Sequence, residues 1–325
     1  MLWKSWNPVS HVWIFLCPSF YDQIKQPYLR HQPPTTMLQV LSRVSRPRAA
    51  CVLKSAGLLS SSFSTSPSSD NVVEVDGCNL HVKVQGPTTG DKKLLLCLPG
   101  AMGTAETDWQ YQFEGLSEAH TVVSFDPRGY GKSRPPGRRF PADYYHRDAA
   151  DGVAVMDALF GSDAIFDVMG WSDGANAGVI LAAKNVFRVR KLVIFGGNSY
   201  LTDEDIEAYE ATRDVEATWS PRMRGALEAV YGLEELQKMW SSACDGWGEI
   251  LREGGGDICQ KEARALLCPT LVLGGEKDPI VPTFHPHWFA DNIPGSSLHM
   301  FPQGKHNIHQ KYAEEFNKKV AEFLA

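Results

Sequence analysis

One serine in the chain stands between two glycines at a junction that could make it a nucleophile. The motif Gly-Trp-Ser-Asp-Gly spans residues 170–174, after an apolar run at 164–169 and before a helix-forming stretch at 175–184. A sharp strand-to-helix turn needs strained backbone angles, and small flanking residues let the strand and the helix approach closely. The Ser172 hydroxyl would then project at a helix N-terminus, where free N–H groups favour developing negative charge. The alternative role is a plain helix cap, but the context favours a nucleophile.

A serine hydroxyl is a weak nucleophile unless a base removes its proton and an acid orients that base. Asp278 follows an apolar run at 270–273, and His306 follows the next run at 297–301. The order serine, acid, histidine along the chain fits a sheet whose strand ends carry all three groups. We therefore predict that Asp278 orients His306 and that His306 takes the proton of Ser172.

Other acids and histidines near these positions fit less well. Glu276 is closer to the end of its strand, and Asp291 lies too far beyond it. We expect His285, His287 and His309 to be surface residues. His285 and His287 could together hold a metal, but no third ligand stands at helical or strand spacing from them, and zinc sites need at least three protein ligands.

A second glycine-containing turn could donate backbone N–H groups to an oxyanion. It reads Pro-Gly-Ala-Met-Gly over residues 99–103 and follows the apolar run 94–98. An oxyanion hole combines the N–H of the residue after the nucleophile with one N–H from an earlier loop. We predict the N–H of Asp173 for the first donor and that of Ala101 or Met102 for the second. The residues alone do not choose between those two, and an ordinary turn is the alternative.

The acid directly after the nucleophile has two possible roles. In the first turn of a helix, Asp173 would gain about 0.3–1 kcal/mol from the helix dipole, so a structural role would suffice. A buried negative charge beside a forming oxyanion is nevertheless costly unless a cation arrives. The ammonium group of a substrate, two bonds from the scissile carbonyl, would supply that cation. The residues leave both roles open.

Runs of strand length and segments of helical length alternate through residues 70–325. Residues 72–84 read as two strands around an Asp-Gly turn,. Runs suited to buried parallel strands are 94–98, 121–125, 164–169, 192–195, 270–273 and 297–301,. In the loop after 121–125, Asp126 and Arg128 are expected to form an ion pair that holds a turn. The alternation predicts an α/β domain with a mostly parallel sheet flanked by helices and opened by an antiparallel hairpin.

Residues 200–265 interrupt the alternation. They contain three tryptophans and no convincing strand, and they hold 15 acidic and 7 basic residues, a net charge of −8. We interpret this region as a helical cap inserted over the sheet. Its charge would attract cationic substrates over a long range, although solubility alone could also account for it.

Residues 1–69 have a different composition from the rest. They contain a single acid, Asp22, against seven basic residues, and the stretch from Met37 to residue 69 holds no acid at all but many serines. A segment rich in Arg and Ser and free of acids is typical of a mitochondrial transit peptide. We expect a leader that directs the chain to the mitochondrial matrix, with a merely disordered tail as the alternative. Met37 could be a second start site.

Composition excludes several other classes. The 325 residues carry a net charge of −6 and no block of Lys and Arg, so a nucleic-acid partner is not expected. The longest apolar run near the N-terminus covers about residues 11–17, far short of the roughly 20 residues of a membrane span,. The seven cysteines form no CxxC pair, so neither a zinc finger nor a disulfide framework is expected,.

Taken together, the motifs resemble those of the α/β-hydrolase superfamily. The resemblance covers roughly residues 72–325 and rests on six strings: LLCLPGAMGTAETDW, DPRGYGKSRPP, GWSDGANA, TDEDIEAYEATRDV, GEKDPIVP and PQGKHNIH. The strings are most similar to the members that cleave α-amino-acid esters, including amino-acid ester prodrugs of nucleosides. The resemblance implies a mitochondrial serine hydrolase that needs no cofactor. It also implies that Ser172, Asp278 and His306 form the triad and that Asp173 receives the substrate's α-ammonium.

Two other functions remain open at this point. The chain could be a carboxylesterase, thioesterase or lactonase with no preference for an amine. It could also be a ligand-binding member of the fold that has lost turnover, which the complete set of Ser172, Asp278 and His306 argues against. In either case we expect a monomer that acts on a small-molecule ester, with no cofactor and no metal.

Overall fold

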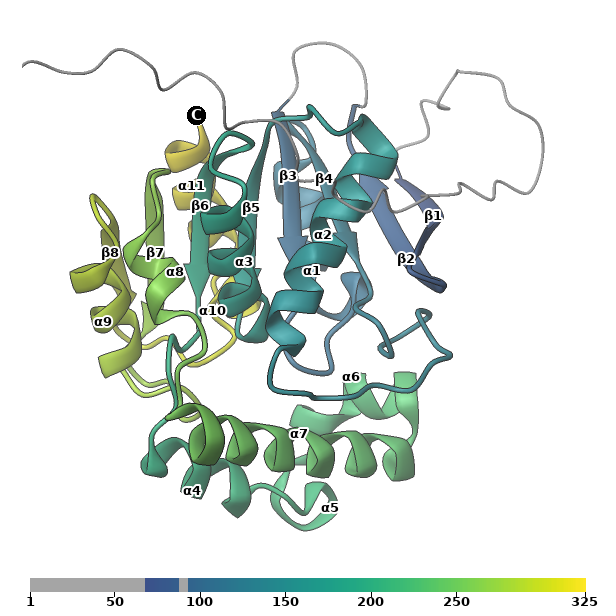
Figure 1. The fold of residues 1–325 in the computed structure, drawn as a ribbon, viewed down its shortest axis with the longest axis vertical. Helices are drawn as coiled ribbons and strands as arrows, with labels where there is room; N and C mark the ends of the chain where they lie inside the picture. Colours follow the sequence, from purple (N-terminus) through teal and green to yellow (C-terminus); the bar gives the residue numbers. More distant parts are fainter. Residues whose placement is uncertain (1–67, 88–92) are drawn as a thin grey trace, which may run out of the picture. The chain divides into compact units, whose positions relative to one another are not determined.

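The computed structural model describes residues 68–87 and 93–325, and within them eight strands form one sheet (Figure 1). In chain order the strands are β1 (Ser68–Val75), β2 (Cys78–Gln85), β3 (Lys93–Leu98), β4 (His120–Phe125), β5 (Phe166–Trp171), β6 (Val189–Phe195), β7 (Thr270–Gly275) and β8 (Ser297–Phe301). Across the sheet their order is β1-β2-β4-β3-β5-β6-β7-β8. Strand β2 runs antiparallel to both neighbours, and every other pair is parallel. The predicted parallel sheet with an opening hairpin is confirmed.

The predicted leader, residues 1–69, lies outside the described residues except for Ser68 and Ser69, with which β1 begins. The domain, expected from residue 70 onward, thus begins two residues earlier in the structure, with β1 at Ser68. None of the helices in the described ranges is long and apolar enough to cross a bilayer.

The central strands β3 to β7 are buried on both faces for most of their length, which explains why they read as continuous apolar runs,. Side chains along a strand alternate between faces. In β3, Leu95 and Cys97 belong to a core shared with Trp109 and Phe316, whereas Leu96 and Leu98 belong to the core on the opposite face. All four β3 side chains are at most 3% exposed.

Helices cover both faces of the sheet (Figure 1). The helices of the body are α1 (Ala105–Leu116), α2 (Tyr144–Phe160), α3 (Asp173–Lys184), α8 (Gln260–Arg264), α9 (Phe284–Asn292), α10 (Ile308–Lys311) and α11 (Ala313–Leu324). Helices α1, α10 and α11 pack together, whereas α2 and α8 pack against α3. Between β6 and α8 come the helices α4 (Asp203–Ala211), α5 (Val215–Thr218), α6 (Pro221–Tyr231) and α7 (Leu233–Gly254).

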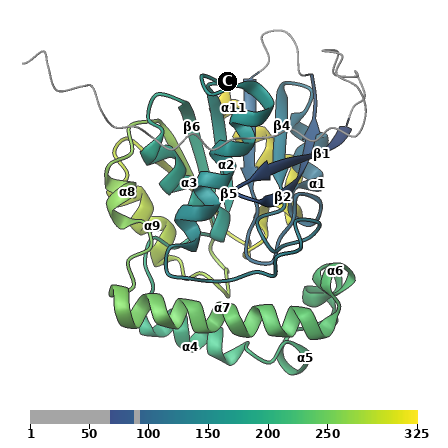
Figure 2. The same ribbon diagram turned by 45° about the vertical axis from the view of Figure 1, so that its right-hand side comes forward.

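These four helices form a separate layer below the carboxyl ends of the strands (Figures 1 and 2). Helix α7 is its long axis, and α4, α5 and α6 all pack on it. We call α4–α7 the cap. Helix α8 falls within the range 200–265 expected for the cap, but it packs on α3 and α9 of the body. The region contains helices only, as its sequence indicates, apart from an isolated bridge between Tyr200 and Asp257.

Candidate active site

Ser172 occupies the sharp turn between β5 and α3, with φ +55° and ψ −122°. A positive φ is strained for a residue with a Cβ. The flanking glycines have no room for side chains. A Cβ on Gly170 would lie 2.2 Å from the Gly174 carbonyl oxygen, and a Cβ on Gly174 would lie 2.0 Å from the carbonyl oxygen of Leu98. The close approach expected from the Gly-x-Ser-x-Gly pattern is therefore present, and it requires glycine at both positions.

Asp278 and His306 form a hydrogen-bonded pair. The His306 Nδ1 lies 2.8 Å from Asp278 Oδ2, while Asp278 Oδ1 accepts the N–H groups of Ile280 and Val281. Burial would raise the pKa of Asp278, but His306 and the two backbone N–H groups outweigh it and hold the pKa below its usual range. An ionised acid that accepts from Nδ1 leaves Nε2 of His306 available to take a proton.

The structure brings this pair to the same sheet edge as Ser172, because the three residues follow β5, β7 and β8. Trp171, the last residue of β5, donates its indole N–H to the His306 carbonyl oxygen at 3.1 Å, and the two rings lie 5.4 Å apart. The described contacts include no hydrogen bond between Ser172 and His306. Catalytic hydrogen bonds are often long before substrate binds, so the placement fits a serine, a base and an orienting acid.

Asp173 is the second charged group at the elbow, and it is held by neutral donors. The hydroxyl of Tyr144 donates to Oδ2 at 2.9 Å and that of Tyr145 to Oδ1 at 3.1 Å. The indole N–H of Trp247, from cap helix α7, donates to both hydroxyl oxygens, at 2.8 and 3.1 Å. Each phenol has one proton and its oxygen accepts from Trp247, so both protons are directed to Asp173. Burial raises the pKa of Asp173 to about 6, against the lowering effects of the Tyr144 hydroxyl, Arg138 and the Tyr145 hydroxyl.

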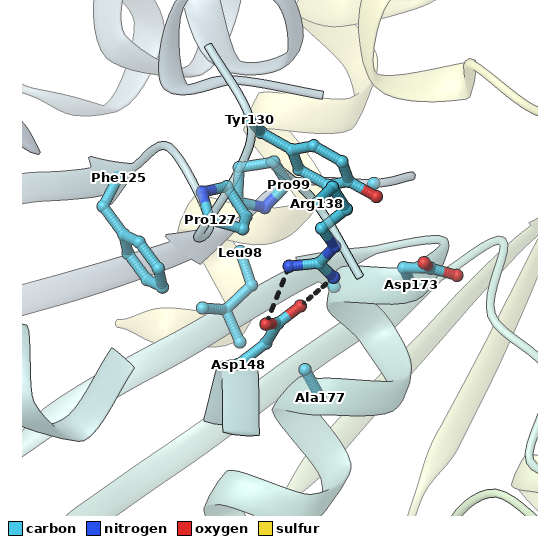
Figure 3. Close-up of a pocket in the computed structure, with 11 residues that line it drawn as sticks. Leu98, Pro99, Phe125, Pro127, Tyr130, Arg138, Asp148, Asp173 and Ala177 are labelled. Carbon is cyan, nitrogen blue, oxygen red and sulfur yellow. Dashed lines mark hydrogen bonds and ion pairs between the residues drawn. The ribbon is translucent and has the colours of Figure 1, made fainter. Parts of the chain in front are cut away.

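The nearest cation, Arg138, is already paired. Figure 3 shows its guanidinium bound to Asp148 in the wall of a small cavity that Asp173 also lines. Two hydrogen bonds of 3.0 and 2.5 Å join Arg138 to Asp148, and the Tyr130 ring lies 4.3 Å from the guanidinium carbon. No Lys, Arg or His of the described residues forms an ion pair with Asp173. A negative charge with no cation of its own therefore lies next to Ser172.

The predicted oxyanion turn lies against the elbow. A Cβ on Gly100 would be 3.2 Å from the Ser172 Cβ. Asp173 is the first residue of α3, so its N–H has no partner within the helix,. The N–H of Ala101 donates to no other described residue in the hydrogen bonds of this turn, whereas the backbone of Met102 also acts on the buried hydroxyl of Tyr130 and lowers its pKa against the effect of burial. Ala101 and Met102 both stay predictions for the second donor.

Two histidine predictions are wrong. His285 and His309, expected at the surface, are fully buried, whereas His287 is exposed. His285 pairs with the buried carboxylate of Asp205 at 3.1 Å. His309 packs between aromatic rings and its Nε2 lies 3.0 Å from the Asp108 carbonyl oxygen; burial lowers its pKa to about 3, so it is neutral.

The expected ion pair between Asp126 and Arg128 does not form. Asp126 accepts the backbone N–H groups of Ala105 and Lys132, at 2.9 and 2.8 Å. Arg128 instead binds Asp151 through two hydrogen bonds of 2.6 Å. The Asp126 carboxylate therefore holds the turn through backbone N–H groups, with His81 Nδ1 3.6 Å away, and without the arginine. Within the described ranges no group of three His, Cys, Asp or Glu side chains is placed to hold a metal.

The donors that surround Asp173 were not predictable from the sequence. Tyr144, Tyr145 and Trp247 meet only because α2, α3 and α7 converge at the elbow, and the spacing of the residues along the chain carries no sign of it. The adjacent tyrosines are a weak signal, because two neighbouring aromatic residues with hydroxyls at the start of a helix point to a polar partner when both are buried,.

Comparison with known proteins agrees with this geometry. Residues 93–310 match the model of the alpha/beta hydrolase fold family. The chain is 44% identical over 263 residues to serine hydrolase BPHL (biphenyl hydrolase-like, valacyclovir hydrolase) of Homo sapiens, covering 81% of this chain and 88% of that protein. It is 29% identical to a putative carbamate hydrolase, RutD, of Caulobacter sp. (strain K31), over 77% of this chain and 97% of that one.

Solved structures show the same fold at lower identity. The enol-lactonase of Burkholderia xenovorans LB400 superimposes with a TM-score of 0.62 and 21% identity, over 78% of this chain and 99% of that chain. Family, relatives and fold thus agree with the elbow and the Asp–His pair, and the chain belongs to the α/β-hydrolase family, among its serine hydrolases.

Proposed function

We propose that this serine hydrolase cleaves esters of α-amino acids through an acyl-enzyme intermediate. His306, oriented by Asp278, takes the Ser172 proton as the hydroxyl oxygen attacks the ester carbonyl. The oxyanion accepts the N–H of Asp173 and that of Ala101 or Met102. The protonated His306 then gives its proton to the leaving alcohol as the ester C–O bond breaks. Water, activated by the same base, releases the amino acid and restores Ser172.

The observation that carries the proposal is the unpaired carboxylate of Asp173. It lies one residue from the nucleophile, both its oxygens accept tyrosine hydroxyls, and its neighbour Arg138 is bound to Asp148. A charge kept without a cation in a largely enclosed position costs stability. A substrate ammonium would offset that cost. In an α-amino ester the ammonium lies two bonds from the carbonyl carbon that Ser172 attacks, so it would lie near the residue that follows Ser172. The net charge of −8 over residues 200–265 would add a long-range attraction for cations,.

The name of the human relative agrees with this proposal, because valacyclovir is an amino-acid ester. Esterases, thioesterases or lactonases without amine preference share the same triad and are the competing proposal. The two differ in one property only, the dependence of the rate on a charged amine.

The test compares two valine esters of the same alcohol, one with its α-amine free and one N-acetylated. We expect kcat/KM to be at least about 100-fold higher for the free amine, which corresponds to about 2.7 kcal/mol. Asp173→Asn, which keeps the shape and removes the charge, should abolish most of this preference and leave the N-acetylated ester nearly unaffected. Similar rates for both esters in the wild type would leave a general serine esterase. An equal loss on both esters in the variant would make Asp173 structural.

For the leader we propose import into the mitochondrial matrix, on the strength of its composition. Residues 37–69 contain Arg43, Arg46, Arg48 and Lys54 and no acid,. A fluorescent reporter fused to the C-terminus of residues 1–69 should enter mitochondria, where proteolytic removal of the leader should reduce its mass. A second reporter fused to residues 37–69 shows whether residues 1–36 are needed for import. A reporter that stays in the cytosol in both fusions would contradict the proposal.

A further inference from the structure

The turn that faces the nucleophile is held in a strained conformation. The N–H of Gly103 donates to the Gly100 carbonyl oxygen at 3.0 Å, which closes a β-turn over Ala101 and Met102. Met102 has φ +61° and its side chain is fully buried. A positive φ at the third position is the mark of a type II turn and normally belongs to glycine. For methionine it costs about 1–2 kcal/mol, so other contacts must hold the turn in place.

Two side chains fix this turn from opposite ends. The buried carboxylate of Asp108, from α1, accepts the Gly100 N–H at 2.9 Å. The phenol of Tyr231 donates to the Met102 carbonyl oxygen at 2.8 Å. The oxygen of the same phenol accepts the N–H of Gly131 at 3.0 Å. A phenol has a single proton, so with Gly131 as the donor to its oxygen, the proton of Tyr231 is committed to Met102.

Tyr231 reaches the turn from the cap. It is the last residue of α6, stands 129 residues after Met102 in the chain and is 8% exposed. The guanidinium of Arg134 packs on the Tyr231 ring, with its carbon 4.7 Å from the ring centroid. Whereas Asp108 belongs to the body, Tyr231 belongs to the layer below the strand ends in Figures 1 and 2. The cap therefore contacts the oxyanion turn directly through a buried hydrogen bond.

We propose that Tyr231 is a positioning residue for the oxyanion hole: its hydrogen bond to Met102 keeps the turn of residues 100–103 aimed at Ser172, so that seating of the cap completes the site. Without that bond, the strained Met102 relaxes, and rotation of its peptide groups moves the donor N–H away from the oxyanion. Oxyanion donors act only when they point at the position that the charged oxygen will occupy. The inference rests on serine-hydrolase chemistry and not on the preference for an amine.

The experiment replaces Tyr231 with Phe, which removes one oxygen and keeps the ring against Arg134. Removal of an oxyanion donor itself costs about 100- to 1000-fold in kcat; because Tyr231 only orients a donor, we expect about a tenfold loss. The loss should be equal for the free-amine and the N-acetylated valine ester, with KM within about twofold of wild type. Affinity for a tetrahedral boronate inhibitor should fall by the same factor as kcat, since the boronate oxygen occupies the oxyanion site. Rates are expressed per active site, titrated with a fluorophosphonate.

Trp240→Phe is the matched control. Trp240 lies in cap helix α7, is also 8% exposed and donates one hydrogen bond to a backbone carbonyl, that of Thr212 at 2.9 Å. It should lower the urea midpoint at least as much as Tyr231→Phe and leave kcat and boronate affinity unchanged. Wild-type kcat per titrated site in Tyr231→Phe would overturn the inference. So would a loss that Trp240→Phe reproduces, because the effect would then come from general loosening of the cap. A wild type with equal rates on both esters would refute the amine preference and leave this comparison intact.

Discussion

Two Asp–His pairs in this chain have similar distances and very different surroundings. His306 Nδ1 and Asp278 are 2.8 Å apart, with side chains 12% and 6% exposed, and the His306 ring lies 5.4 Å from that of Trp171, the residue before Ser172. His285 and Asp205 are 3.1 Å apart and both fully buried, between α9 of the body and α4 of the cap. In both pairs burial would raise the pKa of the acid, but the neighbouring histidine and further hydrogen-bond donors outweigh it, so the pKa is lowered.

The difference lies in the second ring nitrogen. In His306 the second nitrogen, Nε2, makes no hydrogen bond to another described residue, and the residue belongs to the sheet edge that carries Ser172, where the proposed mechanism has Nε2 accept a proton. In His285 the second nitrogen, Nδ1, is buried with no hydrogen-bond partner among the described residues, and the rings of Tyr200 and Phe284 pack against the imidazole with ring centroids 5.0 and 4.2 Å from its own. An Asp–His pair can thus act in catalysis only when the second ring nitrogen can reach a reacting atom. When that nitrogen is buried, as in His285, the pair instead joins the cap to the body.

Replacing His306 with Ala gives the largest effect expected from this contrast. Loss of one member of a triad removes nearly the whole contribution of the set, so kcat on the valine ester should fall by at least about 10⁴-fold. The free energy of unfolding, measured in urea, should change by about 1 kcal/mol or less, because the side chain is partly exposed and Asp278 keeps the backbone N–H groups of Ile280 and Val281 as donors. Turnover within about 100-fold of wild type would remove His306 from the mechanism.

Replacing His285 with Ala should have the opposite profile. Breaking a buried pair leaves Asp205 as an uncompensated buried charge, which typically costs about 3–5 kcal/mol. The free energy of unfolding should fall by about 3 kcal/mol, while kcat per titrated active site should stay within about threefold of wild type. His287→Ala, an exposed neighbour on α9, is the control and should change stability by less than about 0.5 kcal/mol,. A loss of kcat in His285→Ala as large as that in His306→Ala would erase the distinction between the pairs.

The same contrast shows what the sequence could and could not predict. The placement of Ser172, Asp278 and His306 at one edge of the sheet was predictable because parallel strands bring their carboxyl ends together, so that an acid and a histidine after β7 and β8 must lie near the residue that follows β5. The burial of His285 and His309 was not predictable. Their partners Asp205 and Asp108 stand 80 and 201 positions away in the chain. The residues next to each histidine give no sign that it packs between two layers of the structure.

The strands followed from the sequence for a related reason. Burial on both faces makes the central strands β3 to β7 largely continuous apolar runs, and such a run is visible without knowing its neighbours,. The helices of the cap were predicted as a region, but their packing was not, because α8 lies within the same stretch and joins the body instead. Tyr144 and Tyr145 meet Asp173 because three helices converge there, and the periodicity of a single segment cannot predict which helices converge.

Asp173 extends the comparison to a third enclosed acid, one with hydroxyl partners in place of a histidine. Burial raises its pKa to about 6, whereas the pKa values of Asp278 and Asp205 are lowered. If the ionised form binds the substrate ammonium, the preference for the free amine must weaken as the pH falls through 6. Between pH 7 and pH 5 we expect the ratio of kcat/KM for the free-amine ester to that for the N-acetylated ester to fall about tenfold, since a single group with a pKa near 6 goes from mostly ionised to mostly protonated.

Taking the ratio removes the pH dependence that the two esters share through the triad, so only Asp173 and the substrate amine remain. A free α-amine loses its proton with a pKa of about 7.7–8.0, and the ratio should therefore also fall above pH 8, giving a maximum near pH 7. In Asp173→Asn the acid limb should vanish, because no charge forms there on raising the pH. A ratio that stays constant from pH 5 to pH 7 in the wild type would show that the ionisation of Asp173 does not select the substrate. The hydroxyls of Tyr144 and Tyr145 would then stabilise the elbow only, much as Asp205 and His285 stabilise the contact between cap and body.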